Sequence, residues 1–389
     1  MGRCLLLCLL VSLTATSLVH GHVQTTIRSG AATARGVNLG GWLVLERWMT
    51  SYAEIWKKVP ESIKDHGEYA AMAAVGRATA DPLIKMHRDA WITEDDIKEI
   101  ASYGMNLVRV PVGWWIYEKP QETDWQHFTP GGLAYLDRLM NEWAIKYNVA
   151  VLLDIHAAKG SQNGREHSAA PVFGATNFTD YAVNVDRTIE TVLFLVDRYK
   201  RAPAFLGIEL LNEPEWWQDQ KKGTDRAKLK QYYRDLYATT RALCGDCVVV
   251  ISPFLSEQDS AHGEWGALFP DSSPVNNWID WHKYLKWGFE GQNMDQITSS
   301  GVDNIEKDLK AWCGNNRVFM GEWSLGHPDS AQAQFQDDAK VALLGQRLVN
   351  ALDSAKAGWT FWSWKADYGT RYGDGWNMRS LLRDKLLKI

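Results

Sequence analysis

Two glutamates occupy positions where a carboxylate could take part in chemistry. Glu213 follows the apolar run at residues 208–211 and precedes Pro214, which has no backbone N–H and therefore ends strand pairing. Glu322 follows a second apolar run, in Gly321-Glu322-Trp323-Ser324. A carboxylate delivered by a buried strand is costly unless it has a partner or a chemical role. The alternative interpretation is a polar loop residue after a core strand in each case.

The elements that would position these glutamates recur along the chain as short apolar runs. Strands are predicted over residues 34–39, 106–112, 149–156, 205–211, 248–252, 278–282, 317–321 and 358–362. Apolar residues at helical spacing occupy 133–147, 181–199, 226–243, 305–312 and 331–355, and Thr93 with Asp96 indicates another helix N-terminus. Near-continuous apolar strands predict a parallel sheet covered by helices.

The alternation predicts an α/β fold, specifically a (β/α)8 TIM barrel with an enlarged first βα loop at residues 41–91. An open doubly wound sheet is the alternative, but no Gly-rich phosphate loop follows an early strand. The active site of a barrel gathers at the C-terminal ends of its strands. The polar and aromatic residues at or near these ends are Asn38, Glu46, Arg109, Asp154, His156, Asn212, Glu213, His282, Tyr284, Glu322, Trp323, Trp362 and Trp364.

Glu213 and Glu322 belong to the fourth and seventh predicted strands, which face each other across the mouth of a barrel. A retaining glycosidase uses one protonated carboxyl group to donate to the leaving oxygen and one carboxylate to attack the sugar, about 5–5.5 Å apart. The 20 tryptophans suit a protein that handles sugars, although a large core would also absorb many of them.

The composition of the chain limits the kinds of partner that it is expected to bind. The formal charge of −5 gives no support to nucleic acid or an anionic membrane as a partner. The histidines lack the spacing of a metal-binding helix and no Gly-x-Ser-x-Gly segment occurs, so we expect no cofactor and no metal. No repeat or linker divides the chain, so a single catalytic domain is predicted over residues 22–389, acting as a monomer.

Residues 1–21 resemble a secretory signal peptide, with Arg3 before a short apolar run and small residues after it. No later segment is apolar enough to span a membrane, so an extracellular or cell-wall-associated protein is expected. Cys4 and Cys8 would leave with the signal peptide. The remaining Cys244, Cys247 and Cys313 predict one disulfide and one free thiol without fixing the pairing, and Asn177 begins a glycosylation sequon.

Six segments, in order, resemble the fungal exo-β-1,3-glucanases of glycoside hydrolase family 5. They are residues 35–46 (RGVNLGGWLVLE), 106–115 (NLVRVPVGWW), 154–164 (DIHAAKGSQNG), 208–214 (IELLNEP), 320–324 (MGEWS) and 358–365 (GWTFWSWK). The resemblance extends over essentially the whole chain after the signal peptide. It implies a secreted enzyme that releases glucose from the non-reducing end of β-1,3-glucan with retention of configuration. The alternatives are an endo-β-1,4-glucanase or mannanase on the same barrel, and an inactive cell-wall carbohydrate-binding protein.

The resemblance implies that Glu213 is the general acid/base and Glu322 the nucleophile. Arg109 and Tyr284 would keep Glu322 ionised, and the nearby negative charge would raise the pKa of Glu213 so that it begins protonated. Arg109 could instead merely neutralise Glu213.

The remaining substrate-binding residues are implied in the same way. Asn212 would bind the sugar 2-hydroxyl, while His156 and His282 would donate hydrogen bonds around the same glucose and Trp362 would stack beneath it. Either histidine could alternatively be a satisfied core residue.

The resemblance also implies roles for the inserted loop and for the site of the outer sugar. Glu46 would bind hydroxyls at the non-reducing end, and with residues 41–91 it would close the pocket for exo attack; helix capping or a salt bridge is the alternative for Glu46. Trp287 would be one side of an aromatic clamp on the next sugar. Its expected aromatic partner is replaced by Arg165-Glu166, which favours a polar grip on that sugar.

Overall fold

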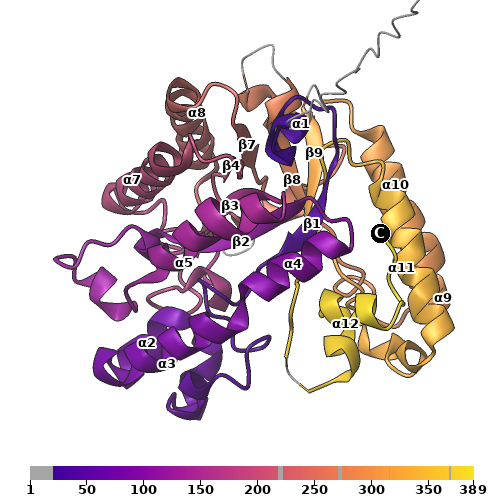
Figure 1. The fold of residues 1–389 in the computed structure, drawn as a ribbon, viewed down its shortest axis with the longest axis horizontal. Coiled ribbons are helices and arrows are strands. Elements are labelled where there is room, and N and C mark those ends of the chain that lie inside the picture. The colour runs from indigo at the N-terminus through magenta and orange to yellow at the C-terminus, as the bar shows by residue number, and fades with distance from the viewer. Residues whose placement is uncertain (1–20, 218–221, 270–273, 315, 368) are drawn as a thin grey trace, which may run out of the picture.

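The computed structural model describes residues 21–217, 222–269, 274–314, 316–367 and 369–389 (Figure 1). Eight parallel strands close into a barrel in the order β1-β10-β9-β8-β7-β4-β3-β2. They are β1 (Ala34–Asn38), β2 (Leu107–Gly113), β3 (Ala150–Ala157), β4 (Phe205–Glu209), β7 (Val248–Ile251), β8 (Asn277–His282), β9 (Arg317–Glu322) and β10 (Gly358–Phe361). The predicted (β/α)8 barrel is therefore confirmed, with every strand in its expected place. A separate antiparallel hairpin pairs β5 (Trp216–Trp217) with β6 (Lys222–Gly223).

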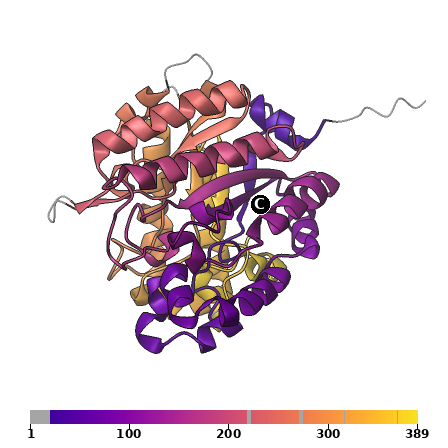
Figure 2. The same ribbon diagram turned by 90° about the vertical axis from the view of Figure 1, so that its left-hand side faces the viewer.

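Helices cover the outside of the barrel in both views (Figures 1 and 2). The helices of the described residues, including α2 and α3 of the first loop, are α1 (Val23–Arg28), α2 (Glu68–Val75), α3 (Arg77–Trp91), α4 (Glu94–Ser102), α5 (Gly132–Arg138), α6 (Ala144–Lys146), α7 (Ala182–Tyr199), α8 (Arg226–Leu243), α9 (Met294–Gln296), α10 (Val302–Ala311), α11 (Asp338–Leu352) and α12 (Met378–Arg383). The predicted capping box forms at α4, where Thr93 donates to the Asp96 carboxylate at 2.9 Å. The helix expected from residue 331 begins only at Asp338, because the Asp337 carboxylate accepts from the first free backbone N–H groups and fixes the N-terminus there.

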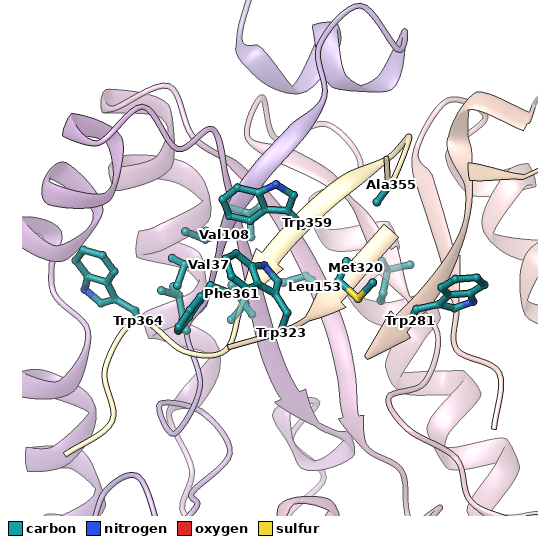
Figure 3. Packing of buried hydrophobic residues seen from close by; sticks show 14 of the residues in the cluster. Val37, Val108, Leu153, Trp281, Met320, Trp323, Ala355, Trp359, Phe361 and Trp364 are labelled. Atoms are coloured by element: carbon teal, nitrogen blue, oxygen red, sulfur yellow. The ribbon is translucent and has the colours of Figure 1, made fainter. Parts of the chain in front are cut away.

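The core has an outer and an inner part. Outward-facing strand residues pack beneath the helices, where the Trp323 ring lies edge-on to Trp359 and Phe361 at centroid distances of 5.2 and 4.9 Å (Figure 3). Among the residues whose burial is described, eight tryptophans are less than 2% exposed, so much of the high tryptophan content serves core packing rather than sugar contact. Inside the barrel, Leu107 and Leu152 belong to an apolar cluster that fills its N-terminal part.

Two positions further along the same strands, the barrel interior becomes charged. Leu107 is followed by Arg109 on β2, and Leu152 by Asp154 on β3, and both charged side chains are completely buried. Side chains alternate along a strand, so residues two apart point the same way. The charged side chains consequently lie above the apolar cluster, toward the C-terminal ends of the strands.

The enlarged first loop is confirmed and is itself folded. Residues 41–91 include α2 and α3 and bury a cluster that contains Leu45, Ile55, Trp56 and Met72. The buried Glu68 carboxylate accepts a hydrogen bond from the backbone N–H of Leu45 at 2.9 Å. This contact ties α2 to the start of the loop and so fixes the segment that carries Glu46.

Cys244 and Cys247 form a disulfide and Cys313 is an exposed free thiol, as the count of cysteines predicts. Cys4, Cys8 and nearly all of the predicted signal peptide lie outside the described residues. Among the helices of the described ranges, none is long and apolar enough to cross a membrane. Asn177 is half-buried, and its glycosylation stays a prediction.

Candidate active site

Glu213 and Glu322 meet at the C-terminal end of the barrel. Glu322 is the last residue of β9, whereas Glu213 lies four residues beyond the end of β4. One carboxylate oxygen of each, together with a ring nitrogen of His282, lie within 4.8 Å of one another. This separation suits a nucleophile and an acid/base that act on the same face of a sugar. Glu213 also has φ of 40°, an unfavourable backbone conformation for a residue with a Cβ, as is common at functional sites.

Two donors hold the Glu322 carboxylate. Arg109 donates from Nη1 to Oε1 at 3.1 Å, and the Tyr284 hydroxyl donates to Oε2 at 2.6 Å. Charge-assisted hydrogen bonds of this kind stabilise an ionised carboxylate and fix its orientation. Both predicted partners of Glu322, Arg109 and Tyr284, therefore contact its carboxylate.

Arg109 organises the whole floor of the site. It is completely buried and pairs with Glu209 at 2.8 Å and Asp154 at 3.1 Å, in addition to Glu322. It also donates to the Asn212 side-chain oxygen at 2.9 Å. These contacts argue against the alternative in which Arg109 serves only to neutralise Glu213.

Arg109 positions the side chain of Asn212 through its oxygen atom and leaves the amide nitrogen of Asn212 without a contact to Arg109. The Nδ2 atom is buried and has no hydrogen-bond partner among the described residues. A buried donor without a partner is rare and costs about 1–3 kcal/mol. The free donor fits the predicted contact to a sugar hydroxyl.

The surroundings of Glu213 differ from the expectation. Its Oε1 lies 2.6 Å from His282 Nδ1, and its Oε2 lies 3.3 Å from His167 Nε2. Burial raises the pKa of Glu213, but the hydrogen bonds and positive charges of His167 and His282 outweigh this and bring it well below its usual range. The expectation of a raised pKa is therefore wrong for this arrangement, because it considered Glu322 and not the two imidazoles.

Both ring nitrogens of His282 are paired with carboxylates, so neither is left to donate to a glucose hydroxyl as the sequence predicts. Its Nε2 lies 2.7 Å from Asp280 Oδ2 while Nδ1 faces Glu213. Burial lowers the pKa of His282, but Glu322, Asp280 and Glu213 outweigh it and raise that pKa well above the usual value. The ring is thus held as an imidazolium among three carboxylates, with Glu322 Oε2 3.5 Å from Nδ1.

His156 and Trp362 form the neighbouring wall. Their rings stack at a centroid distance of 5.3 Å and an interplanar angle of 4°, and His156 Nδ1 lies 2.7 Å from Asp154 Oδ2. Asp154 thereby links this wall to Arg109. The arrangement is compatible with the predicted sugar-facing role of both rings.

Glu46 lies in the first loop beside the same cluster. The Trp48 indole donates to its Oε2 at 2.8 Å, while Oε1 is buried without a hydrogen-bond partner among the described residues. Carboxylate oxygens of Glu46 and Glu166 and a ring nitrogen of His167 lie within 4.8 Å of one another. Burial raises the pKa of Glu46 to about 8, although His167 opposes the shift.

The side of Glu213 that would face a leaving group is polar. Arg165 forms a bidentate pair with the buried Glu215, at 2.5 and 3.2 Å. Trp287 is 62% exposed at the rim and lies near Tyr284 and Trp376, at centroid distances of 5.6 and 6.0 Å. Arg165, one of the two residues that replace the expected aromatic partner of Trp287, therefore belongs to an ion pair with Glu215.

Five residues of this site were missed by sequence reasoning: Glu209, Asp280, His167, Glu215 and Trp376. Glu209 and Asp280 carried a signal, since each is a charged residue inside an apolar strand. Two groups, Glu213, His282 and Glu322 as well as Glu209, Asp280 and His282, could approach a metal ion geometrically. Because these carboxylates already accept hydrogen bonds from imidazole, guanidinium or phenol groups, the donor set fits an acid–base network better than a metal site.

A (β/α)8 barrel with two such carboxylates at the mouth has the architecture of a retaining glycoside hydrolase. Residues 72–368 match the sequence model of the family described as Cellulase (glycosyl hydrolase family 5). The chain belongs to this family, as its resemblance predicts.

Individual relatives carry different names. Glucan endo-1,6-beta-glucosidase B of Emericella nidulans is 30% identical over 355 residues, which cover 86% of this chain and 81% of that protein. Glucan 1,3-beta-glucosidase of Blumeria graminis is 30% identical over 398 residues, which cover 91% and 86% respectively. The crystal structure of rutinosidase from Aspergillus niger shares the fold, with a TM-score of 0.74, 20% identity, and coverage of 92% of this chain and 98% of that one.

Proposed function

We propose that the chain is a secreted retaining β-glucosidase that releases glucose from the non-reducing end of β-1,3-glucan. The observation that carries this proposal is the meeting of Glu213 and Glu322 within 4.8 Å, where Glu322 accepts hydrogen bonds from Arg109 and Tyr284 while Glu213 faces two imidazoles. The substrate would be a β-glucan polysaccharide or oligosaccharide. Secretion is inferred from the signal-like residues 1–21.

The reaction would proceed by double displacement. Glu322, held by Arg109 and Tyr284, attacks the anomeric carbon while the glycosidic oxygen takes a proton from Glu213. Water then attacks the glucosyl ester as the Glu213 carboxylate removes its proton. Two inversions give β-glucose.

The free atoms around the pair would bind the glucose. Asn212 Nδ2 is available for the 2-hydroxyl, and the stacked His156 and Trp362 rings offer a wall for the sugar face. Glu46 Oε1 is available for hydroxyls at the non-reducing end. Because Glu46 sits on the folded insertion of the first loop, that loop would close the pocket beyond one glucose and so favour exo attack.

An endo-acting β-1,6-glucanase is the second candidate, because a relative with that name is as similar as the 1,3-glucosidase. The endo-β-1,4-glucanase or mannanase and the inactive binding protein are tested by the same experiment.

The purified protein is incubated with laminarin, a linear β-1,6-glucan, carboxymethylcellulose and mannan, and the products are separated by chromatography. We expect single glucose units from laminarin, with the β-anomer appearing first by proton NMR. A ladder of β-1,6 oligosaccharides would instead favour the second candidate. A ladder from cellulose or mannan, or binding without release of sugar, would overturn both.

A further inference from the structure

Each carboxylate oxygen of Glu213 has its own imidazole. His282 contacts Oε1, and His167 contacts Oε2 from the short turn Glu166–Ser168 that follows β3. The His167 side chain is 13% exposed, so its contact with Glu213 is largely shielded from solvent. The two imidazoles differ in the other hydrogen-bond partners of their ring nitrogens.

His282 is fixed as a double donor. With Glu213 on Nδ1 and Asp280 on Nε2, loss of either proton would leave a carboxylate without its donor. Asp280 is further held by the backbone N–H of Gly321, at 2.7 Å. This imidazolium is therefore poorly suited to giving up a proton during a reaction.

His167 faces two groups with opposite demands on the same nitrogen. The Glu213 carboxylate favours a proton on Nε2, while the Asn163 amide nitrogen, 3.0 Å away, favours a lone pair there. Asn163 is oriented by its other contacts, since its Nδ2 donates to the Glu213 carbonyl and its Oδ1 accepts from the Arg165 backbone. The Asn163 contact consequently weakens the hold of His167 on its Nε2 proton, and Glu213 Oε2 lies 3.3 Å away to receive that proton.

The charges around His167 favour a protonated imidazole before the reaction begins. Glu166 and Glu46 come within 4.8 Å, and the charge of Glu215 also interacts with Glu213 and His167. The neighbouring ring is His156, at a centroid distance of 5.4 Å. Burial lowers the pKa of His167, but the hydrogen bond to Glu213 and the charges of Glu213, Glu166 and Glu46 raise it to about 10.

We propose that His167 is a positioning residue that stores the proton which Glu213 delivers to the leaving oxygen and later receives from water. The inference rests on the proposed acid/base role of Glu213. It explains how a carboxyl group surrounded by two imidazoles can act as an acid.

The proton balance is closed over one turnover. In the first step the Nε2–H bond of His167 breaks as an O–H bond forms on Glu213. That proton then passes to the glycosidic oxygen as the bond to the anomeric carbon breaks. In the second step Glu213 takes a proton from the attacking water and returns it to Nε2, which restores the starting charges.

The test compares His167→Asn with the wild-type protein over a range of pH. Asparagine keeps a donor near Glu213 but cannot store a proton. The kcat/KM is measured with whichever β-1,3- or β-1,6-linked oligosaccharide the wild type cleaves best, and with an activated dinitrophenyl β-glucoside, whose leaving group needs no acid. His262→Asn, which removes a surface histidine paired with Asp259, is the matched control.

For the oligosaccharide, we expect the alkaline limb of the His167→Asn profile to move to lower pH by about one unit or more, with about tenfold lower kcat/KM near pH 8. The dinitrophenyl glucoside should change by no more than about twofold, and so should both substrates with His262→Asn. An unmoved alkaline limb, or equal losses on both substrates, would overturn the inference while leaving the proposed function intact. A wild type that cleaves neither substrate would overturn both.

A second measurement does not depend on the variant folding. Nitrogen-15 NMR of histidine-labelled wild-type protein counts the imidazoles that stay doubly protonated near pH 8. We expect two, His167 and His282. One or none would overturn the storage role of His167.

Discussion

Glu322 and Glu213 lie side by side but are supported by different kinds of structure. Glu322 ends a barrel strand and is held by Arg109 from inside β2 and by Tyr284 just after β8. Glu213 lies beyond its strand and is shared between His282 at the end of β8 and His167 in a loop. The proposed nucleophile is thus fixed mainly by the barrel, and the proposed acid/base partly by a loop.

This difference separates two tasks. A carboxylate that must stay ionised benefits from a rigid cation and a short phenol hydrogen bond, which the barrel register supplies. A carboxyl group that gains and loses a proton needs neighbours that can themselves titrate, and loops can vary these without altering the barrel. The same loop carries Arg165, so it also shapes the side where the leaving sugar would lie.

The largest effect should follow from removing the barrel-held carboxylate. Glu322→Ala should lower kcat by at least about 10⁴-fold, because no group remains to form the glucosyl ester. Added azide should restore turnover of an activated aryl glucoside and give the α-glucosyl azide, detected by NMR. Glu306→Ala, at an exposed glutamate paired with Lys310, is the control. A Glu322→Ala protein with near-normal activity would remove the distinction between the two carboxylates.

Removing the loop-supported carboxylate should be selective. Glu213→Ala should reduce kcat/KM for oligosaccharides by about 10²–10⁴-fold, because their leaving group needs a proton. The kcat/KM of Glu213→Ala for dinitrophenyl glucosides should fall much less. Full activity of Glu213→Ala on laminarin would show that another residue is the acid.

The barrel side should also dominate stability. Arg109→Leu leaves Glu209, Asp154 and Glu322 buried without their cation, so the free energy of unfolding should fall by about 3–5 kcal/mol in urea titrations. Arg347→Leu, which breaks an exposed pair with Asp303, should cost no more than about 1 kcal/mol. Equal losses for the two variants would mean that the buried cluster is not a stability centre.

The loop side should show its effect through pH. Burial raises the pKa of Glu46 to about 8, so the folded protein retains a proton that the unfolded chain loses above about pH 4.5. The resulting stabilisation is present below about pH 4.5 and is lost as the pH rises to about 8. Glu46→Gln removes this loss, so its stability relative to the wild type should increase over that range by a few kcal/mol, on the order of 2–4, in urea titrations. A difference that does not change with pH would contradict the buried state of Glu46.

The smallest effect should appear at the leaving side. Arg165→Gln keeps a donor for Glu215 but removes the charge, so KM for a trisaccharide should rise by about three- to tenfold. The KM for a dinitrophenyl glucoside should stay nearly constant, since it lacks the outer sugar. A uniform change in both would assign Arg165 to the loop structure alone.

The barrel and the Glu322 side could be predicted because their information is local in sequence. The apolar runs mark the strands, and a charged residue within a run or at its end, such as Arg109 or Glu322, is then expected at the mouth of the barrel. Asp280 and Glu209 could have been added by the same rule. His167 and Glu215 could not, because their positions depend on the path of an irregular loop and a hairpin that no periodicity describes. The error in the pKa of Glu213 follows from leaving the contacts of both imidazoles, His167 and His282, out of its surroundings.

The central claim is that Glu322 forms the covalent bond and Glu213 manages the proton. The most direct test is to incubate the protein with dinitrophenyl 2-deoxy-2-fluoro-β-glucoside, which accumulates the glucosyl ester, and to locate the label by mass spectrometry of peptides. The account predicts one fluoroglucosyl group on the peptide that contains Glu322. A label on Glu213, or complete inactivation without a label on either glutamate, would contradict it.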